Sequence, residues 1–309
     1  MNNLERYNHL NKYLKNKFGE RSLKICVDGN FTCPNRDGTL GKGGCIFCSE
    51  QGSGEHLKHK LEISEQVTSF LNSYRGERAN KFIVYFQNFS NTYAPVETLK
   101  QKYDSALIDE RIVGISVATR PDCINEEIVK LLATYKEKYY VCVELGLQTS
   151  NNITGKLINR VYTSEDFTTS VKLLNEYNID VVTHIMVGLP NETRKDLENT
   201  VAFLNNHDLQ GLKIHSTYVV KNTVLEKMYL NGNYTPITLE AYLEDLEYII
   251  THINPNIIIH RISGDAPKES LIAPSWNIHK KLVLNGLDKI LREKNLEQGM
   301  HYKKGISLS

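Results

Sequence analysis

The sequence lacks the long apolar runs and the charge bias that mark several classes of protein. No apolar stretch approaches the roughly 20 residues that a helix needs to cross a bilayer. The polar start MNNLERYNHLNKYLKNKFGE contains no apolar core of a secretion signal. Internal repeats and low-complexity tracts are absent as well. We therefore expect a cytoplasmic protein without a membrane partner, whose cysteines stay reduced rather than paired in disulfides.

The remaining composition is that of an ordinary globular protein with an uneven charge distribution. The 309 residues are 40% hydrophobic and 24% charged, enough for a large core in one or two domains. The net charge is only +1, yet residues 1–24 carry six Lys or Arg against two Asp or Glu, and residues 266–309 carry eight against four. Solvated helical faces are the usual reason for such charge runs, and a polyanionic partner is the alternative.

Short β-branched runs alternate along the chain with longer amphipathic segments. Strands are expected at 22–27, 81–87, 112–119, 139–148, 180–189, 212–220 and 256–262, with helices near 57–76, 96–108, 125–137, 164–177, 192–206 and 238–252. Several of these strands are nearly continuous in apolar residues, as in sheets that are covered on both faces. The alternation predicts βαβ crossovers and a parallel sheet, either a partial barrel or an open doubly wound sheet.

The stretch CPNRDGTLGKGGCIFCSEQGSG, residues 33–54, concentrates cysteine and glycine. It holds Cys33, Cys45 and Cys48 of the six cysteines, together with six of the nineteen glycines. It follows the first expected strand, and ligands of parallel α/β folds bind at the carboxyl ends of strands. Cys26 and Cys142 lie within expected strands and are read as core residues, whereas Cys123 follows a strand end.

The spacing C-x11-C-x2-C indicates a metal site on this loop. A structural zinc site needs four protein ligands, and His56 and His59 are the available additions to the three thiols. Three thiolates on a glycine-rich loop suit a [4Fe–4S] cluster better, with one iron left open for another ligand. We expect Phe47, just before the last cysteine, to cover that site.

Further motifs follow the cysteine loop in order along most of the chain. They are NFTCPNRDGT, YFQNFSNTYAP, ISVATRPDC, VELGLQT, LINRVYT, HIMVGLPNET, LKIHSTYVVKNT and HRISGDAP. With these motifs the sequence resembles the radical S-adenosylmethionine (SAM) superfamily, in particular its YhcC/YtqA-like (MnmL-type) group, which is related to the catalytic subunit of Elongator. The usual cysteine spacing of the superfamily is C-x3-C-x2-C, and the wider spacing here is similar to that of this group.

The resemblance implies an α/β fold that is a partial (β/α)6 TIM-like barrel. Residues 22–265 would form this core, with a basic N-terminal extension at 1–21 and a basic helical extension at 266–309. It also implies two cofactors, a [4Fe–4S] cluster and SAM. Cys33, Cys45 and Cys48 would be the catalytic ligands of the cluster.

By the same resemblance, polar residues near the strand ends would bind SAM. These are Gln87, Asn88, Ser116, Glu144, Gln148, Arg160 and His184. Gln148 would contact the ribose or methionine part, and Arg160 the carboxylate, which a planar guanidinium can meet with two parallel hydrogen bonds. Glu144 lies in an apolar strand and needs a partner, either the cofactor or a core Lys or Arg.

Other residues of these motifs are expected around the barrel mouth. Gly188 and Pro190 would shape the turn beneath the adenine of SAM. Positive groups suit an anionic substrate or the SAM carboxylate, and those expected near the later strand ends are Arg120, Lys213, His215 and Arg261.

The resemblance further implies tRNA as the partner, with a flavodoxin or ferredoxin as electron donor. The group is associated with wobble uridine, where a 5-carboxymethylaminomethyl group becomes a 5-aminomethyl group, with or without a 2-thio group. Because only residues 266–309 follow the expected barrel, we do not expect the acetyl transfer of Elongator. Two alternatives stay open, a radical SAM enzyme for a small molecule and a non-catalytic zinc-binding RNA module.

Overall fold

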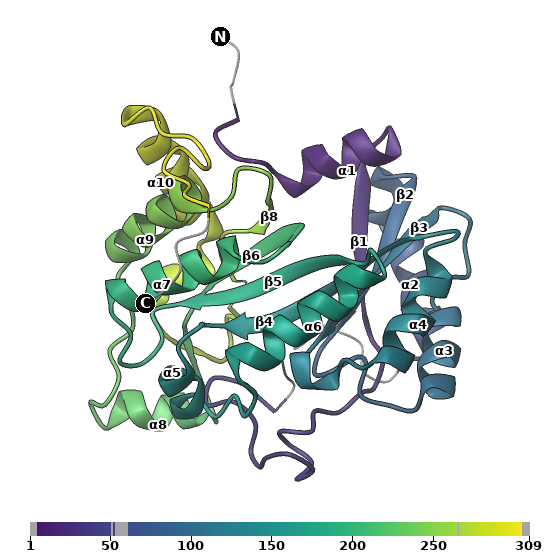
Figure 1. Cartoon of the computed structure of the whole chain (residues 1–309), viewed down its shortest axis with the longest axis horizontal. Coiled ribbons are helices and arrows are strands. Elements are labelled where there is room, and N and C mark those ends of the chain that lie inside the picture. Colours follow the sequence, from purple (N-terminus) through teal and green to yellow (C-terminus); the bar gives the residue numbers. More distant parts are fainter. Residues whose placement is uncertain (1–4, 51, 53–60, 265, 305–309) are drawn as a thin grey trace.

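The computed structural model describes residues 5–50, 52, 61–264 and 266–304, and it contains one large parallel sheet. Its seven strands follow one another in the order of the chain. They are β1 Ser22–Asp28, β2 Lys81–Gln87, β3 Ile112–Thr119, β4 Tyr140–Gln148, β5 Asp180–Val187, β6 Gly211–Ser216 and β8 Ile258–Arg261. The sheet curls into part of a barrel, with the connecting helices on its outer face (Figure 1). The predicted α/β partial barrel is thus confirmed.

The helices between the strands cover the outer face of the sheet. They are α2 Ile63–Leu71, α3 Val96–Asp104, α4 Glu126–Tyr135, α6 Ser164–Glu176, α7 Arg194–Asn205 and α9 Leu239–His252, and α10 Lys280–Glu293 packs beside α9. Short polar side chains begin several of them: Asn125, Thr163 and Thr238 accept hydrogen bonds from backbone N–H groups of the first turn of α4, α6 and α9.

Alternation along each strand separates an apolar outer face from a polar inner face. In β1, Ile25 and Val27 are fully buried within the main hydrophobic core, while Lys24 and Cys26 take the alternate positions. The same alternation places Glu144 on the inner face of β4. Charged groups therefore gather inside the curled sheet, and the apolar core lies between sheet and helices.

The N-terminal segment closes the seam between the two edge strands of the barrel. Asn8 accepts a hydrogen bond from the backbone N–H of Ile259 in β8 at 2.8 Å, and α1 (Leu10–Phe18) contacts both β1 and β8. Arg6 meets Glu297 at 3.4 Å, so the two basic ends of the chain lie together. α1 lies at the end of the sheet opposite the cysteine loop (Figure 1).

The structure differs from the sequence prediction in several elements. The strand expected at 212–220 is two, because β6 ends at Ser216 and β7 (Val219–Val220) turns away to pair antiparallel with the unpredicted β9 (Leu271–Ala273). The helix expected at 57–76 is α2 alone within the described part of that range. Two short helices, α5 Asn152–Leu157 and α8 Val224–Leu230, were not predicted. No helix among the described residues is long and apolar enough to span a membrane.

Candidate active site

The loop after β1 owes its path to glycines in conformations that other residues rarely adopt. Gly38, Gly43 and Gly44 have φ values of 95°, 79° and 76°. A Cβ on Gly41 would lie 2.1 Å from the side-chain oxygen of Asn35, so this glycine allows a close approach instead. The glycine content of the stretch therefore serves a tight turn that doubles back between Cys33 and Cys45.

Two asparagines join this loop to the segment after α5. Asn35 Nδ2 donates to the carbonyl of Asn159 at 2.6 Å, and Asn159 Nδ2 donates to the carbonyl of Gly44 at 2.7 Å. Between Cys45 and Cys48, the backbone N–H of Ile46 donates to the carbonyl of Ile158 at 3.1 Å. Sequence reasoning missed Asn35 and Asn159, although both stand beside an arginine within motifs that it had singled out.

Each of the three thiols has a nitrogen donor close to its sulfur. Asn35 Nδ2 lies 3.8 Å from Cys45 Sγ, and Arg36 NH1 lies 3.7 Å from Cys48 Sγ. Arg120 NH1, from the end of β3, lies 3.9 Å from Cys33 Sγ. Donors at all three sulfurs stabilise thiolates, so these residues fit an iron–sulfur cluster.

The thiols are close enough to influence one another electrostatically. Burial, followed by the charge of Cys48, raises the pKa of Cys45 to about 12, with a smaller effect from Cys33. Within the described ranges, no three His, Cys, Asp or Glu side chains could share one metal ion. His56 and His59, considered for zinc, lie outside the described residues.

Arg120 is held rigidly beside Cys33. Its Nε and NH2 donate to the two carboxylate oxygens of Asp122 at 2.8 and 2.5 Å, and its guanidinium lies 4.8 Å from the ring centre of Tyr162. A guanidinium fixed on two sides keeps its remaining nitrogen directed at the sulfur. Arg120, expected at the mouth, therefore lies at the thiol site. Cys123, which follows in the 3-10 turn Pro121–Cys123, is buried.

The end of β2 carries a pair of unusual backbone conformations. Asn88 and Phe89 have φ values of 70° and 51°, which cost energy in residues other than glycine. Asn88 Nδ2 donates to Asp28 at 3.0 Å, while its Oδ1 is buried with no hydrogen-bond partner among the described residues. Gln87 lies beside Asp28 in the register of β1 and β2. Both predicted residues thus lie where β1 leads into the cysteine loop.

The end of β4 is held by two residues from the LINRVYT motif. Gln148 has a φ of 60°, and its Oε1 accepts from the hydroxyl of Tyr162 at 2.6 Å. Arg160 is 1% exposed and donates to the carbonyls of Leu147 and Thr149, each at 2.6 Å. It also donates to the carbonyl of Tyr162 at 2.9 Å and to the side chain of Asn152 at 2.9 Å. The SAM carboxylate contact expected of Arg160 stays a prediction; the structure shows its guanidinium bonded to the carbonyls on either side of Gln148.

We expect Arg160→Ala to weaken both the fold and SAM binding. The change leaves three buried carbonyls without their charged donor, which lowers the free energy of unfolding by about 2–3 kcal/mol. SAM affinity falls with it because the end of β4 loses its support, while iron content is unchanged. Urea unfolding and equilibrium SAM binding measure the two effects. Unchanged stability together with unchanged SAM affinity would show that Arg160 does not contribute to the site.

The inner face of the sheet carries a buried ion cluster centred on Glu144. Glu144 Oε1 accepts from Lys24 at 2.6 Å and from Ser116 at 2.8 Å, and Oε2 meets Lys213 as well as His184 Nε2, the latter at 2.7 Å. The sequence left either the cofactor or a core Lys or Arg as the partner of Glu144, and the structure shows two core lysines. His184 and Ser116, both predicted SAM contacts, are joined to the same carboxylate.

Burial and mutual charge set the protonation of this cluster. Burial opposes the charged form of Glu144, but Lys213 and Lys24 outweigh it and hold its pKa well below the ordinary value. Burial lowers the pKa of His184 to about 4, so the imidazole is neutral at neutral pH. Burial also lowers the pKa of Lys213 to about 8, although Glu144 opposes this.

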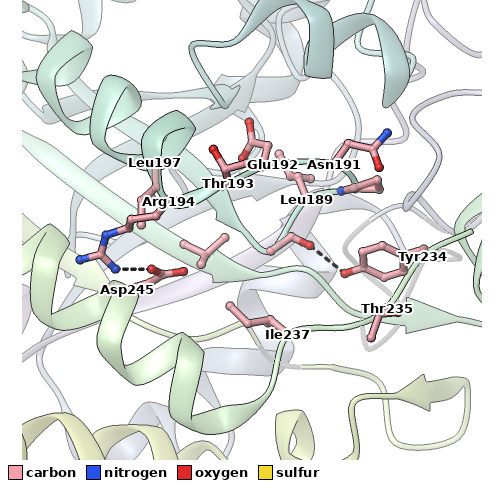
Figure 2. Close-up of a pocket in the computed structure, with 13 residues that line it drawn as sticks. Leu189, Asn191, Glu192, Thr193, Arg194, Leu197, Tyr234, Thr235, Ile237 and Asp245 are labelled. Carbon is pink, nitrogen blue, oxygen red and sulfur yellow. Dashed lines mark hydrogen bonds and ion pairs between the residues drawn. The ribbon is translucent and has the colours of Figure 1, made fainter.

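A separate pocket lies behind the turn after β5 (Figure 2). It has a volume of about 320 Å³ and is bounded by Gly188 to Arg194 and by the segment before α9. Tyr234 donates its hydroxyl proton to the carbonyl of Gly188 at 2.8 Å and so fixes the turn. Burial raises the pKa of Glu192 to about 7. This pocket shares no lining residue with the Glu144 cluster. Gly188 and Pro190, which are expected to shape the turn beneath the adenine of SAM, are among the residues that line it.

Comparisons with known proteins agree with this geometry. The family model of the radical SAM superfamily matches residues 35–204, and that of the radical SAM C-terminal domain matches residues 209–293. Protein YtqA of Bacillus subtilis is 38% identical over 307 residues, which cover 98% of this chain and 95% of that protein. Protein YhcC of Escherichia coli is 33% identical, with 92% of each chain covered.

One more distant relative has a named activity, and another protein has a solved structure of similar fold. A tRNA uridine(34) acetyltransferase of Dehalococcoides mccartyi is 32% identical over 51% of this chain but only 34% of its own length. The solved structure of Elp3 from Methanocaldococcus infernus superposes with a TM-score of 0.70 at 17% identity, covering 90% of this chain and 64% of that one. At that identity the likeness shows the fold alone. The chain belongs to the radical SAM superfamily, whose enzymes use a [4Fe–4S] cluster and SAM, and within it to the YtqA/YhcC-like group.

Proposed function

We propose that this radical SAM enzyme modifies tRNA, converting a 5-carboxymethylaminomethyl group on the wobble uridine into a 5-aminomethyl group. The observation that carries the proposal is the three-thiol loop, in a chain that is similar to a tRNA uridine(34) acetyltransferase. We do not propose acetyl transfer for this chain, because the match covers only 34% of the length of that acetyltransferase.

In this proposal, different residues at the strand ends hold the cluster and SAM. Cys33, Cys45 and Cys48 hold the cluster, and Gln87, Asn88, Ser116, Glu144, Gln148, Arg160 and His184 bind or orient SAM. When bound, the two cofactors supply a 5′-deoxyadenosyl radical that can take a hydrogen atom from an unactivated carbon. The protein orients the substrate carbon and excludes water from the radical.

The substrate chemistry is an oxidative release of the carboxymethyl group. A hydrogen atom leaves the carbon between the amine nitrogen and the carboxylate, and one electron passes to an acceptor of the flavodoxin or ferredoxin type. The N–H proton then leaves, giving a C=N bond. Water adds to that carbon and the C–N bond breaks, so the uridine keeps an aminomethyl group and a two-carbon oxo acid departs. We propose a protein of the same type as the electron donor that starts the cycle.

We expect a strain lacking this protein to lose the 5-aminomethyl nucleosides of its tRNA and to accumulate the 5-carboxymethylaminomethyl forms. Mass spectrometry of digested total tRNA measures both. Wild-type protein supplied in trans restores the aminomethyl forms, whereas Cys45→Ala does not, because it removes a cluster ligand. An unchanged nucleoside profile in the deletion strain would disprove the wobble-uridine function and leave a small-molecule substrate.

A further inference from the structure

We propose that Lys213, assisted by Lys24 and His215, binds the carboxylate of the substrate inside the barrel and so selects substrates that carry this group. The inference deepens the proposed function and rests on it. It assigns to the barrel interior a task separate from that of the cysteine loop, namely recognition of an anion next to the carbon that reacts.

The first argument is the charge balance of the interior. Lys24 and Lys213 both pair with the single carboxylate of Glu144. Among the described residues around Glu144, cations therefore outnumber anions. Excess charge of one sign in an enclosed space is unfavourable, and a bound anion relieves it.

Neighbouring histidines do not alter this balance. Burial, followed in effect by the nearby positive charges, holds the pKa of His260 well below the ordinary value. Burial and then His184 do the same for His215. These rings are therefore neutral at neutral pH, when each offers one N–H donor and one acceptor.

The second argument is unused hydrogen-bonding capacity. An ammonium has three N–H groups, yet Glu144 is the one acceptor that the described residues supply to Lys213 Nζ. His215 Nε2 is buried and has no hydrogen-bond partner in the described part of the chain. Lys213 and His215 are two residues apart on the same face of β6, within reach of the two oxygens of one carboxylate.

Tyr85 fixes the spacing of the two lysines. Its ring centre lies 4.9 Å from Lys24 Nζ and 4.3 Å from Lys213 Nζ, so both ammonium groups rest against one aromatic face or edge. Neither lysine side chain is completely enclosed, because 16% of the Lys24 side chain and 8% of the Lys213 side chain are exposed. The arrangement is thus held in place before a ligand arrives.

The third argument is direction. The parallel strands all run toward the end of the sheet where the cysteine loop begins, and His215 lies nearer that end than Lys213. In this proposal, a carboxylate held by Lys213 and His215 has its adjoining carbon on the side of the thiol site. In a carboxymethylaminomethyl group that adjoining carbon is the one that loses hydrogen.

Two RNAs that differ only in one charge test the inference. Both are anticodon stem–loops, one carrying 5-carboxymethylaminomethyluridine at the wobble position and the other the neutral carboxamide analogue. We expect the reconstituted wild-type enzyme, with SAM, to bind the carboxylate RNA about 10- to 100-fold more tightly, the range for a charge-assisted hydrogen bond. Lys213→Met should abolish this preference while leaving affinity for the carboxamide RNA unchanged.

Matched variants separate recognition from folding. Lys130→Met removes an equal charge from the exposed face of α4 and should keep the full preference. Lys213→Arg should retain part of it. If Lys213→Met does not fold, the wild-type preference itself decides: equal affinity for the two RNAs overturns the inference, as does a preference that persists in folded Lys213→Met.

A small probe distinguishes failure of this inference from failure of the proposed function. If wild-type enzyme binds neither RNA, the wobble-uridine function is wrong, and the interior site is then tested with N-methylglycine by saturation-transfer NMR. Contact with wild-type protein that is lost in Lys213→Met supports a carboxylate site. No contact with the wild-type protein overturns it.

Discussion

Replacing Cys33, Cys45 or Cys48 with Ala is expected to abolish formation of 5′-deoxyadenosine from SAM. Each of these sulfurs has its own nitrogen donor at 3.7–3.9 Å, from Arg120, Asn35 and Arg36 respectively, so no single thiol is redundant. A cluster with one thiolate missing loses either an iron or the geometry that leaves one iron open. Anaerobic reconstitution followed by iron and sulfide analysis, with chromatography of the nucleoside product, measures both losses.

Cys123→Ala is the matched control for these variants. Cys123 is buried three residues after Arg120, and its sulfur meets Asp122 at 3.8 Å rather than another thiol. We expect this variant to keep about four irons per chain, the content of one [4Fe–4S] cluster, and to cleave SAM. If a variant lacking all three loop cysteines held a full cluster and cleaved SAM, the assignment of the thiol site would be wrong.

Glu144→Gln is expected to destabilise the fold by about 3–5 kcal/mol, the cost of removing one partner from a buried ion cluster. The change leaves Lys24 and Lys213 enclosed without a carboxylate. Urea unfolding at neutral pH measures it as a lower midpoint. The exposed pair of Glu126 and Lys130 offers the control, because Glu126→Gln should change stability by less than about 1 kcal/mol.

The pH dependence of this effect follows from the sign of the pKa shift. Burial opposes ionisation, but the two lysines hold the pKa of Glu144 below its unfolded value of about 4.3. Ionised Glu144 therefore contributes its full stability above that value and loses it as the pH falls toward the folded pKa. The difference between wild type and Glu144→Gln should be constant above about pH 5 and narrow below pH 4. A difference that grows on acidification would contradict the ion cluster.

Removing a second charge refines the same test. In Glu144→Gln/Lys213→Met the unpaired cation is gone, so we expect part of the lost stability to return. Equal midpoints for wild type and the single variant would show that Glu144 does not hold the interior together.

The sequence alone determined the fold class and the place of the thiol site. Strand periodicity depends on neighbouring residues, so all seven strands of the sheet were located; both ends of β2 and β3 were correct, whereas each of the other strands differed at one end or both. The prediction of one strand at 212–220 was wrong because the apolar residues of β7 are buried outside the main sheet. Val219 packs into the small cluster around Ile46 and Leu225 and not into the sheet core. The local apolar pattern indicates that a residue is buried, but it does not identify the residues against which that residue packs.

The tertiary structure decided which groups meet. Asn35 donates to the carbonyl of Asn159 and Asn159 donates to the carbonyl of Gly44, so these bonds join residues far apart in the chain, and no spacing rule could pair them. Glu144 likewise shows in sequence only that it needs a partner; the curvature of the sheet brings Lys24 and Lys213 from two other strands to its two oxygens. Charge and residue type are local properties that sequence reports, whereas the interior of the barrel exists only once the strands have curled around it.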